Sequence, residues 1–273
     1  KIVILGSSGY IGSYLTNRFK KNYKVISHSR KKINNKNFNK NIYKKIYGDL
    51  KDKKTIASIL KHQPDVIIFT ISLNHKDSEK NINYSIKNNY LPLLNLICEI
   101  IKKNISPKII YFSTMQVYGR KYDKYLIDEN YKKNIENIYS LTHSMCEDLL
   151  YIFRNKIRSH SLRISNTFGM PVLKNIDCWW LVLNDFCKTA VEKNKIIINS
   201  DGTALRDFVS LDVVKNVIQK LISKNYNMPF LNVCSGRTYS IKEIAQKISL
   251  NPFFKKKLKV EIKKKINKKL KKY

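Results

Sequence analysis

The chain has 273 residues, of which 43% are hydrophobic, so it is long enough for a large α/β domain with a smaller lobe. Lysine and arginine outnumber aspartate and glutamate by 53 to 20, which leaves a formal net charge of +33. Because the lysines are spread through every segment, we interpret this charge as compositional bias, and a nucleic-acid partner is disfavoured. The longest apolar run, Leu91 to Ile101, is too short to cross a bilayer and contains Glu99, so no membrane span is predicted.

The five cysteines are scattered and form no CxxC pair, which indicates neither a disulfide framework nor a metal site. We therefore expect free, mostly buried thiols and a cytoplasmic location. The basic start runs directly into a glycine-rich turn, so no secretory signal is predicted. Since residue 1 is Lys1 and the last residues are rich in lysine, we expect a start methionine before this sequence and a further C-terminal segment after it.

Short apolar runs alternate with helical periodicity over the first 165 residues. The predicted elements are, in chain order, a strand at Ile2–Leu5, a helix at Tyr10–Lys20, a strand starting at Val25, a strand at Ile42–Tyr47, a helix at Lys53–Lys61, a strand at Val66–Phe69, a long helix at Ile82–Lys103, a strand at Lys108–Phe112, a helix at Ile138–Arg154 and a strand at His160–Ile164. Pro92 is awkward inside the long helix. This alternation predicts an α/β fold, a Rossmann-like doubly wound parallel sheet.

The alternation loosens after Pro171, where the sequence predicts helices at Trp179–Val191, Leu211–Ser223 and Ile241–Ser249 and a strand at Leu231–Cys234. We expect residues 1–165 to form a dinucleotide-binding domain. Residues 166–273 are expected to form mainly a smaller C-terminal substrate-binding lobe, with segments around 205–235 returning to the first domain. The lysine-rich tail, Lys255–Tyr273, is interpreted as a solvated amphipathic helix.

A glycine-rich turn, GSSGYIG, joins the first predicted strand to the first helix. Glycines let backbone N–H groups approach a pyrophosphate, and the helix N-terminus supplies partial positive charge. The order of strand, glycine turn and helix therefore predicts a nicotinamide dinucleotide site formed by Gly6, Ser8, Gly9, Tyr10, Ile11 and Gly12.

The second strand ends at Ser29 and Arg30, with no acid. NAD-binding domains usually carry an acid there for the ribose 2′-hydroxyl, whereas a small polar residue followed by arginine suits a 2′-phosphate. NADP is therefore the preferred cofactor and NAD the alternative. After the third strand, Asp49, followed by Leu50, can accept a hydrogen bond from the adenine amine or can cap a turn.

Five motifs in order resemble the extended short-chain dehydrogenase/reductase family, whose best-known members are nucleotide-sugar epimerases, dehydratases and reductases. These motifs are Gly6 to Gly12, Gly48-Asp49-Leu50, the segment STMQVYG from Ser113 to Gly119, Tyr139 with its downstream partner, and Arg206-Asp207-Phe208-Val209. The resemblance covers roughly residues 1 to 250. It implies an NAD(P)-dependent enzyme that modifies a nucleotide sugar for cell-surface polysaccharides. It also implies a possible homodimer through the helices at Ile82–Lys103 and Ile138–Arg154.

The resemblance assigns the chemistry to Thr114, which binds the reacting sugar oxygen, and to Tyr139, the acid/base. The family lowers the pKa of this tyrosine with a lysine four residues later, but His143 stands there. We expect His143 to orient the nicotinamide ribose in an active enzyme with altered pH dependence. The alternative is a catalytically impaired NAD(P)-binding sensor or partner subunit of the same fold.

By position, the resemblance implies that Asn89 steadies the active-site end of the long helix beside the cofactor, and that Asn166 and Arg206 bind the substrate pyrophosphate. Met115 and Gln116 stand where dehydratases of the family carry an acid pair, which disfavours a 4,6-dehydratase. Epimerase and 4-ketoreductase both stay open.

Overall fold

The computed structural model describes residues 1–119 and 126–263, and the chain divides into two compact units. The first unit contains residues 1–164, 171–176 and 211–233. The second contains residues 165–170, 177–210 and the chain from 234 onward. Two segments, 171–176 and 211–233, thus return to the first unit after the chain has entered the second.

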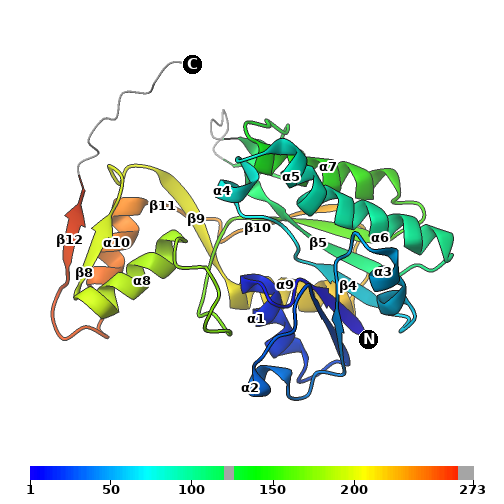
Figure 1. The fold of residues 1–273 in the computed structure, drawn as a ribbon. Coiled ribbons are helices and arrows are strands. Elements are labelled where there is room, and N and C mark those ends of the chain that lie inside the picture. The colour runs from blue at the N-terminus through cyan, green and yellow to red at the C-terminus, as the bar shows by residue number, and fades with distance from the viewer. Residues whose placement is uncertain (120–125, 264–273) are drawn as a thin grey trace. The chain divides into compact units, whose positions relative to one another are not determined.

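A seven-stranded parallel sheet forms the centre of the first unit, in the order β10-β6-β5-β4-β1-β2-β3 (Figure 1). Strands β1, β2, β4 and β5 are buried over their whole length, as expected when both faces of a sheet are covered. Their bounds, in chain order, are β1 (Ile2–Leu5), β2 (Val25–Ser29), β3 (Lys44–Tyr47), β4 (Val66–Phe69), β5 (Lys108–Thr114), β6 (Ser159–Ile164) and β10 (Phe230–Val233). The predicted doubly wound sheet is therefore confirmed.

Helices cover both faces of this sheet because each parallel crossover has to pass over one of them. Helices α1 and α9 contact each other on one face, whereas α3, α6 and α7 lie together on the other (Figure 1). The helices of this unit are α1 (Tyr10–Phe19), α2 (Lys36–Asn39), α3 (Lys53–Leu60), α4 (His75–Ser78), α5 (Ile82–Ser85), α6 (Leu91–Lys102), α7 (Ile138–Ile152) and α9 (Leu211–Ser223).

The long helix predicted over Ile82–Lys103 is present from Ile82 to Lys102, but its middle is not α-helical. A π-helical segment, Ile86–Tyr90, separates α5 from α6, and the Leu91 N–H donates to the Ile86 carbonyl. Pro92 follows in the first turn of α6, where its missing N–H is tolerated. The wider π turn lets the chain pass the proline, which would clash in an α-helix interior.

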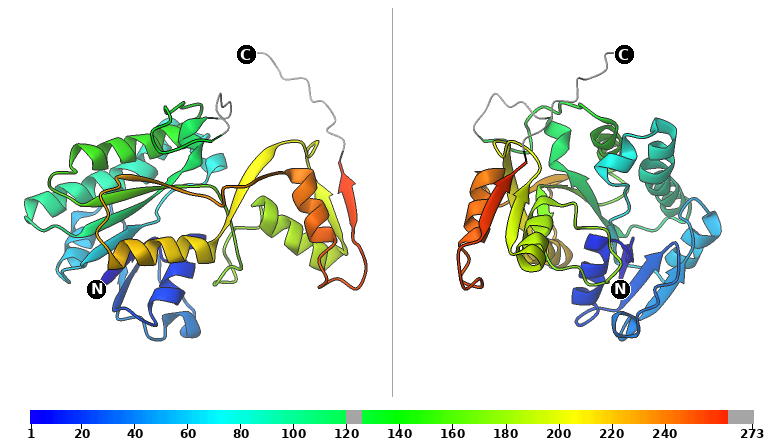
Figure 2. Two further views of the ribbon diagram at one scale, coloured as in Figure 1. Left: turned by 180° about the vertical axis from the view of Figure 1, so that it is seen from behind. Right: turned by 60° about the vertical axis from the view of Figure 1, so that its left-hand side comes forward.

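In the described part of the second unit, two small sheets and two helices surround a core of its own, which includes Phe186, Ile196 and Ala245. Helix α10 packs against α8 and against β8 and β12 (Figure 2). The sheets have the orders β11-β9-β7 and β12-β8. The bounds are β7 (Asn166–Phe168), α8 (Val182–Lys193), β8 (Lys195–Ile198), β9 (Leu205–Ser210), β11 (Thr238–Ser240), α10 (Ile241–Ser249) and β12 (Lys259–Ile262).

Two predictions for this unit are corrected. Helix α8 begins at Val182, three residues after the predicted start at Trp179. The start of the lysine-rich tail is strand β12 rather than a helix, because Val260 and Ile262 extend along β8 and pair with Ile196 and Ile198. The tail from residue 264 onward lies outside the described residues.

None of the five cysteines, all of which lie in the described part of the chain, forms a disulfide. Cys146 and Cys178 are buried, but Cys98, Cys187 and Cys234 are exposed, so the expectation of mostly buried thiols is wrong. Cys98 and Cys187 lie on the outward faces of their helices. Among the described residues, none of the helices is long and apolar enough to cross a membrane.

Candidate functional site

The glycine turn between β1 and α1 forms a cradle of backbone without side chains. Gly6 has a φ of 91°, in the left-handed region that favours glycine. The Gly9 N–H donates to the Gly6 carbonyl at 2.9 Å. A Cβ on Gly12 would lie 2.2 Å from the same carbonyl oxygen, so this position excludes any side chain. The residues therefore fit a pyrophosphate held at the N-terminus of α1.

One pocket of the first unit brings together most of the predicted cofactor residues. Tyr10, Ile11 and Gly12 form the first turn of α1 behind the cradle. The predicted residues that line the pocket are Gly6, Ser8, Gly9, Ser29, Arg30, Asp49 and Leu50. The structure thus joins the glycine turn with the ends of β2 and β3, as the sheet order requires.

The loop that follows β4, from Thr70 to Leu73, lines the same pocket and is not among the residues predicted for the site. The Thr70 N–H and hydroxyl both donate to the Leu5 carbonyl, at 3.0 and 2.7 Å, which fastens this loop beside the glycine turn. The sequence contains the information needed to predict this loop. Strand β4 is the neighbour of β1 in a doubly wound sheet, and ligands bind at the carboxyl ends of such strands.

At the end of β2 the pocket contains no acid. Burial of the His28 imidazole lowers its pKa to about 4, so the ring is neutral, and its Nε2 lies 3.0 Å from the Gly48 carbonyl oxygen, to which it donates. The Ser29 hydroxyl donates to the Lys31 carbonyl, and Arg30 is exposed. The Asp49 carboxylate accepts from the Lys51 N–H, in the manner of a turn cap.

Thr114 and Tyr139 meet at the carboxyl end of β5. The strand runs two residues past its predicted end at Phe112, so Thr114 is its last residue and caps the 3₁₀ turn Met115–Tyr118. Tyr139 is the second residue of α7. Burial raises the pKa of Tyr139 to about 12, and a hydrogen bond with the Thr114 side chain opposes part of that rise. The phenol is therefore protonated at neutral pH.

His143 is buried one helical turn after Tyr139, and both of its ring nitrogens are engaged. Nδ1 lies 2.7 Å from the Tyr111 hydroxyl, and Nε2 lies 3.1 Å from the Ser72 hydroxyl. Because the Ser72 hydroxyl donates its proton to the Leu73 carbonyl, Ser72 accepts from Nε2–H. Nδ1 of the neutral ring must then accept from Tyr111.

This hydrogen-bonded chain has one direction, from Tyr111 through His143 to Ser72. Burial lowers the pKa of His143 to about 4, with a smaller opposing effect of Glu147, so the ring carries no charge at neutral pH. An ammonium ion at this position would favour ionisation of Tyr139, whereas a neutral imidazole does not.

A buried ion pair lies one further turn along α7. The Glu147 carboxylate accepts from Arg163 Nε and Nη2, at 3.0 and 2.8 Å, and from the Ser113 hydroxyl at 2.6 Å. Lys133 lies 3.1 Å from the same carboxylate. These bonds fasten α7 to β5 and β6. Because the Ser113 hydroxyl is used by Glu147, the hydroxyl beside Tyr139 is that of Thr114.

Asn89 lies in the π-helical segment, and its buried side chain is used entirely within the protein. Its oxygen accepts from the Leu73 N–H at 2.7 Å, and its amide nitrogen donates to Thr142 at 3.0 Å and to Ser78 at 3.3 Å. Asn89 therefore joins the pocket loop after β4 to helix α7. A direct contact with a cofactor stays a prediction.

The two predicted substrate residues belong to the second unit. The Asn166 amide donates to the Asp207 carbonyl oxygen, and Arg206 is exposed on the neighbouring strand β9. The Asp207 carboxylate accepts from Ser165, from the Ser235 N–H and hydroxyl, and from the Arg237 N–H. Asp207 is thus occupied in joining β9 to the segment before β11.

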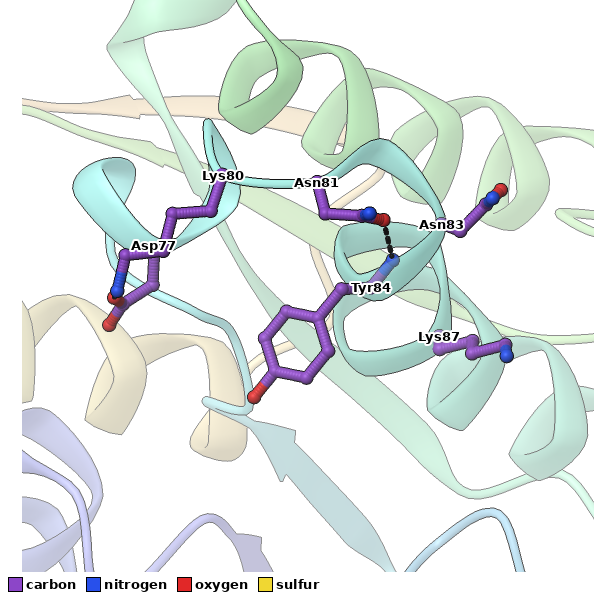
Figure 3. A pocket seen from close by; sticks show the side chains of 6 residues that line it. All are labelled: Asp77, Lys80, Asn81, Asn83, Tyr84 and Lys87. Atoms are coloured by element: carbon purple, nitrogen blue, oxygen red, sulfur yellow. Dashed lines mark hydrogen bonds and ion pairs between the residues drawn. The ribbon is translucent and has the colours of Figure 1, made fainter.

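A second depression lies over α4 and α5, away from the glycine turn (Figure 3). Asp77 and Lys80 pair at one end, Asn83 and Lys87 point to the other, and Tyr84 lies between them. The side chains do not converge on a common point, so this surface does not form a built site. Over the part of the chain that the structure describes, no group of three or more His, Cys, Asp or Glu side chains could hold a metal ion.

Comparison with known proteins places these features in one family. The model of the NAD dependent epimerase/dehydratase family matches residues 2–233. The chain is 26% identical over 250 residues to a GDP-6-deoxy-D-talose 4-dehydrogenase of Aggregatibacter actinomycetemcomitans, a match that covers 90% of this chain and 78% of that protein. It is 24% identical to a dTDP-D-glucose 4,6-dehydratase of Dictyostelium discoideum, over 91% of this chain and 61% of that protein.

The fold matches those of solved epimerases. A UDP-N-acetylglucosamine 4-epimerase from Methanobrevibacter ruminantium, in complex with UDP-N-acetylmuramic acid, has a TM-score of 0.83 at 22% identity, over 96% of this chain and 84% of that one. The NAD complex of a Thermus thermophilus UDP-glucose 4-epimerase has a TM-score of 0.81 at 17% identity, over 95% and 85%. At these identities the likeness extends to the fold alone.

Proposed function

The chain belongs to the NAD dependent epimerase/dehydratase family, and we propose that it is an NADP-dependent 4-ketoreductase of a nucleotide sugar. The observation that carries this proposal is the protonated Tyr139 hydroxyl beside Thr114, with a neutral imidazole at the position of the family lysine. The similarity to a curated 4-dehydrogenase of a GDP-sugar supports the same choice.

The chain's own residues suit the reductive direction. The nicotinamide cofactor, when bound, supplies a hydride to a keto carbon. Thr114 holds the keto oxygen by a hydrogen bond, and the Tyr139 hydroxyl gives that oxygen a proton as it gains charge. An epimerase also needs the opposite half-reaction, in which Tyr139 must first lose its proton. A pKa of about 12 makes the required phenolate rare at neutral pH.

The choice of cofactor rests on the end of β2. Strand β2 ends in Ser29, followed by the exposed guanidinium of Arg30, and carries no carboxylate of its own beside a 2′-phosphate. Arginine binds phosphate through paired N–H groups, which a ribose hydroxyl does not use. These residues support NADP over NAD within an NAD-dependent family.

Two further residues disfavour dehydration. Met115 and Gln116 lie in the turn directly after Thr114, and neither side chain can exchange a proton. Elimination of water needs an acid for the leaving hydroxyl and a base for the adjacent proton. We therefore favour the reductase over the dehydratase, although one curated relative is a 4,6-dehydratase.

The proposal also covers substrate binding, cellular location and oligomeric state. Asn166 and Arg206 bind the substrate pyrophosphate, for which the exposed Arg206 guanidinium is suited. The enzyme works in the cytoplasm on precursors of surface polysaccharides. It forms a homodimer through α5–α6 and α7, as the resemblance to its family implies.

The test begins with fluorescence titration of NADPH and NADH into the wild-type chain, into Tyr139→Phe and into the control Tyr151→Phe on the exposed side of the same helix. UDP-, dTDP-, GDP- and CDP-linked 4-keto sugars are then scanned for NADPH consumption. We expect consumption by the wild type and Tyr151→Phe, and a loss of about 100-fold or more in Tyr139→Phe without loss of cofactor binding. Isomer formation without net NADPH consumption would indicate an epimerase instead. Binding without turnover would indicate the non-catalytic module.

A further inference from the structure

Ser72 connects the buried His143 to the cofactor pocket. Ser72 is exposed and lines the same pocket as the glycine turn and Arg30. Its oxygen is the last acceptor of the chain that runs from Tyr111 through His143. His143 is itself buried and absent from the pocket lining, and Ser72 is the pocket residue that its imidazole contacts by a hydrogen bond.

The bonds of Ser72 leave one acceptor site open. A serine hydroxyl has one proton to donate and two lone pairs that accept. The proton goes to the Leu73 carbonyl at 2.8 Å, and one lone pair accepts from Nε2–H of His143. The second lone pair is therefore available to a donor in the pocket. Because each bond in such a chain polarises the next, the oxygen is a fixed acceptor.

We propose that Ser72 accepts a hydrogen bond from a hydroxyl of the nicotinamide ribose, and that His143 and Tyr111 are positioning residues that hold Ser72 for this contact. This inference rests on the proposed function, since it requires a nicotinamide cofactor in the pocket. It assigns the cofactor contact to the loop after β4, at Ser72, rather than to position 143 of α7. The direction of the hydrogen bond to the ribose is also reversed. A lysine ammonium at position 143 would donate to the ribose hydroxyl, whereas Ser72 accepts from it.

The experiment compares two ligands that share one half. NADPH contains the nicotinamide ribose, whereas 2′-phospho-ADP carries only the adenosine half with its phosphates. Both are titrated by calorimetry into the wild-type chain, Ser72→Ala and Ser72→Thr. We expect Ser72→Ala to weaken NADPH binding about five- to tenfold, the loss of one hydrogen bond, and to leave 2′-phospho-ADP binding unchanged. Ser72→Thr, which keeps the hydroxyl, restores NADPH binding.

Tyr111→Phe tests the positioning role without touching the pocket. It removes the donor to Nδ1 and frees the imidazole to change tautomer, so we expect NADPH binding to weaken about two- to threefold, with 2′-phospho-ADP unaffected. Equal losses for both ligands in Ser72→Ala, or no loss for either, would overturn the inference. If the wild-type chain binds neither NADPH nor NADH, the proposed function fails and the inference fails with it. If the wild type binds NADPH and Ser72→Ala binds it as tightly, only the inference fails.

Discussion

The rings of Tyr139 and His143, one turn apart on α7, lie edge to face with centroids 4.5 Å apart and an interplanar angle of 67°. This arrangement is the favourable one for two aromatic rings, and it gives Tyr139 a packing partner instead of a cation. The hydrogen bonds from Tyr111 and to Ser72 hold the imidazole in place from the other side. His143 therefore gives the phenol an ordered neighbour that carries no charge.

Replacement of His143 by lysine should bring back the missing cation. An ammonium ion ~5 Å from the phenol, at an effective dielectric constant of ~20, is worth about 3 kcal/mol, or roughly two pKa units. Reduction requires protonated Tyr139, so its rate is constant below the pKa of Tyr139 and falls above it. In the wild type this pKa is about 12, so we expect a flat rate up to pH ~10.

In His143→Lys the decline in kcat/KM for reduction should begin near pH ~8, about two pH units earlier than in the wild type, while oxidation of the product alcohol becomes faster near neutral pH. The profile is measured as NADPH consumption from neutral to alkaline pH. His143→Gln, which is neutral, serves as the control and should keep the flat profile. An unchanged profile in His143→Lys would show that position 143 does not act on Tyr139 by charge.

Cofactor choice should reverse when the end of β2 gains an acid. Ser29→Asp combined with Arg30→Ala removes the phosphate partner and adds a carboxylate that accepts from a ribose 2′-hydroxyl. We expect NADPH to bind at least about tenfold more weakly and NADH more tightly. The measurement is a fluorescence titration with both cofactors. Lys31→Ala, at the next exposed position, controls for the loss of one positive charge and should keep the preference.

The sequence predicted the parts of the fold that local patterning specifies. The apolar runs, such as Val66–Phe69, and the glycine turn located the parallel sheet and the cradle, because buried strands and close backbone approach each demand particular residues. The π segment before Pro92 escaped prediction, since a proline in an apolar helix is equally consistent with a kink or a break.

The environment of His143 could not be predicted, because it depends on residues far apart in the chain. Tyr111 and Ser72 are separated from His143 by 32 and 71 positions, and neither stands in a recognisable motif. Whether an imidazole is charged is decided by burial and by its partners, and both come from the packed structure. The sequence therefore identified the unusual position but not its neutral state.

The cradle should not tolerate a side chain at Gly12. In Gly12→Ala the added Cβ would lie 2.2 Å from the Gly6 carbonyl oxygen and 2.8 Å from Thr70, so the turn or the start of α1 has to move. We expect loss of NADPH binding and a lower melting temperature. Gly236→Ala is the control, because its Cβ would meet nothing within 4 Å, and its backbone strain comes instead from a positive φ of 76°. It should lower stability by about 1 kcal/mol and leave cofactor binding intact.

The buried pair of Glu147 and Arg163 should dominate the stability of helix α7. In Glu147→Gln the guanidinium keeps its charge in a buried site without a carboxylate, and such changes lower the free energy of unfolding by about 3 to 5 kcal/mol. Asp148→Asn is the matched control, because Asp148 is the next residue, is exposed and pairs with Lys133 at 2.7 Å. Exposed pairs are worth about 0 to 1 kcal/mol.

Urea denaturation of both variants measures this difference. The double variant Glu147→Leu with Arg163→Met removes both charges, and we expect it to regain part of the loss because no unpaired ion is left. Equal stability of Glu147→Gln and the wild type would show that the buried guanidinium does not need the carboxylate charge. An intact NADPH affinity in every folded variant would show that this pair fastens α7 without forming part of the cofactor site.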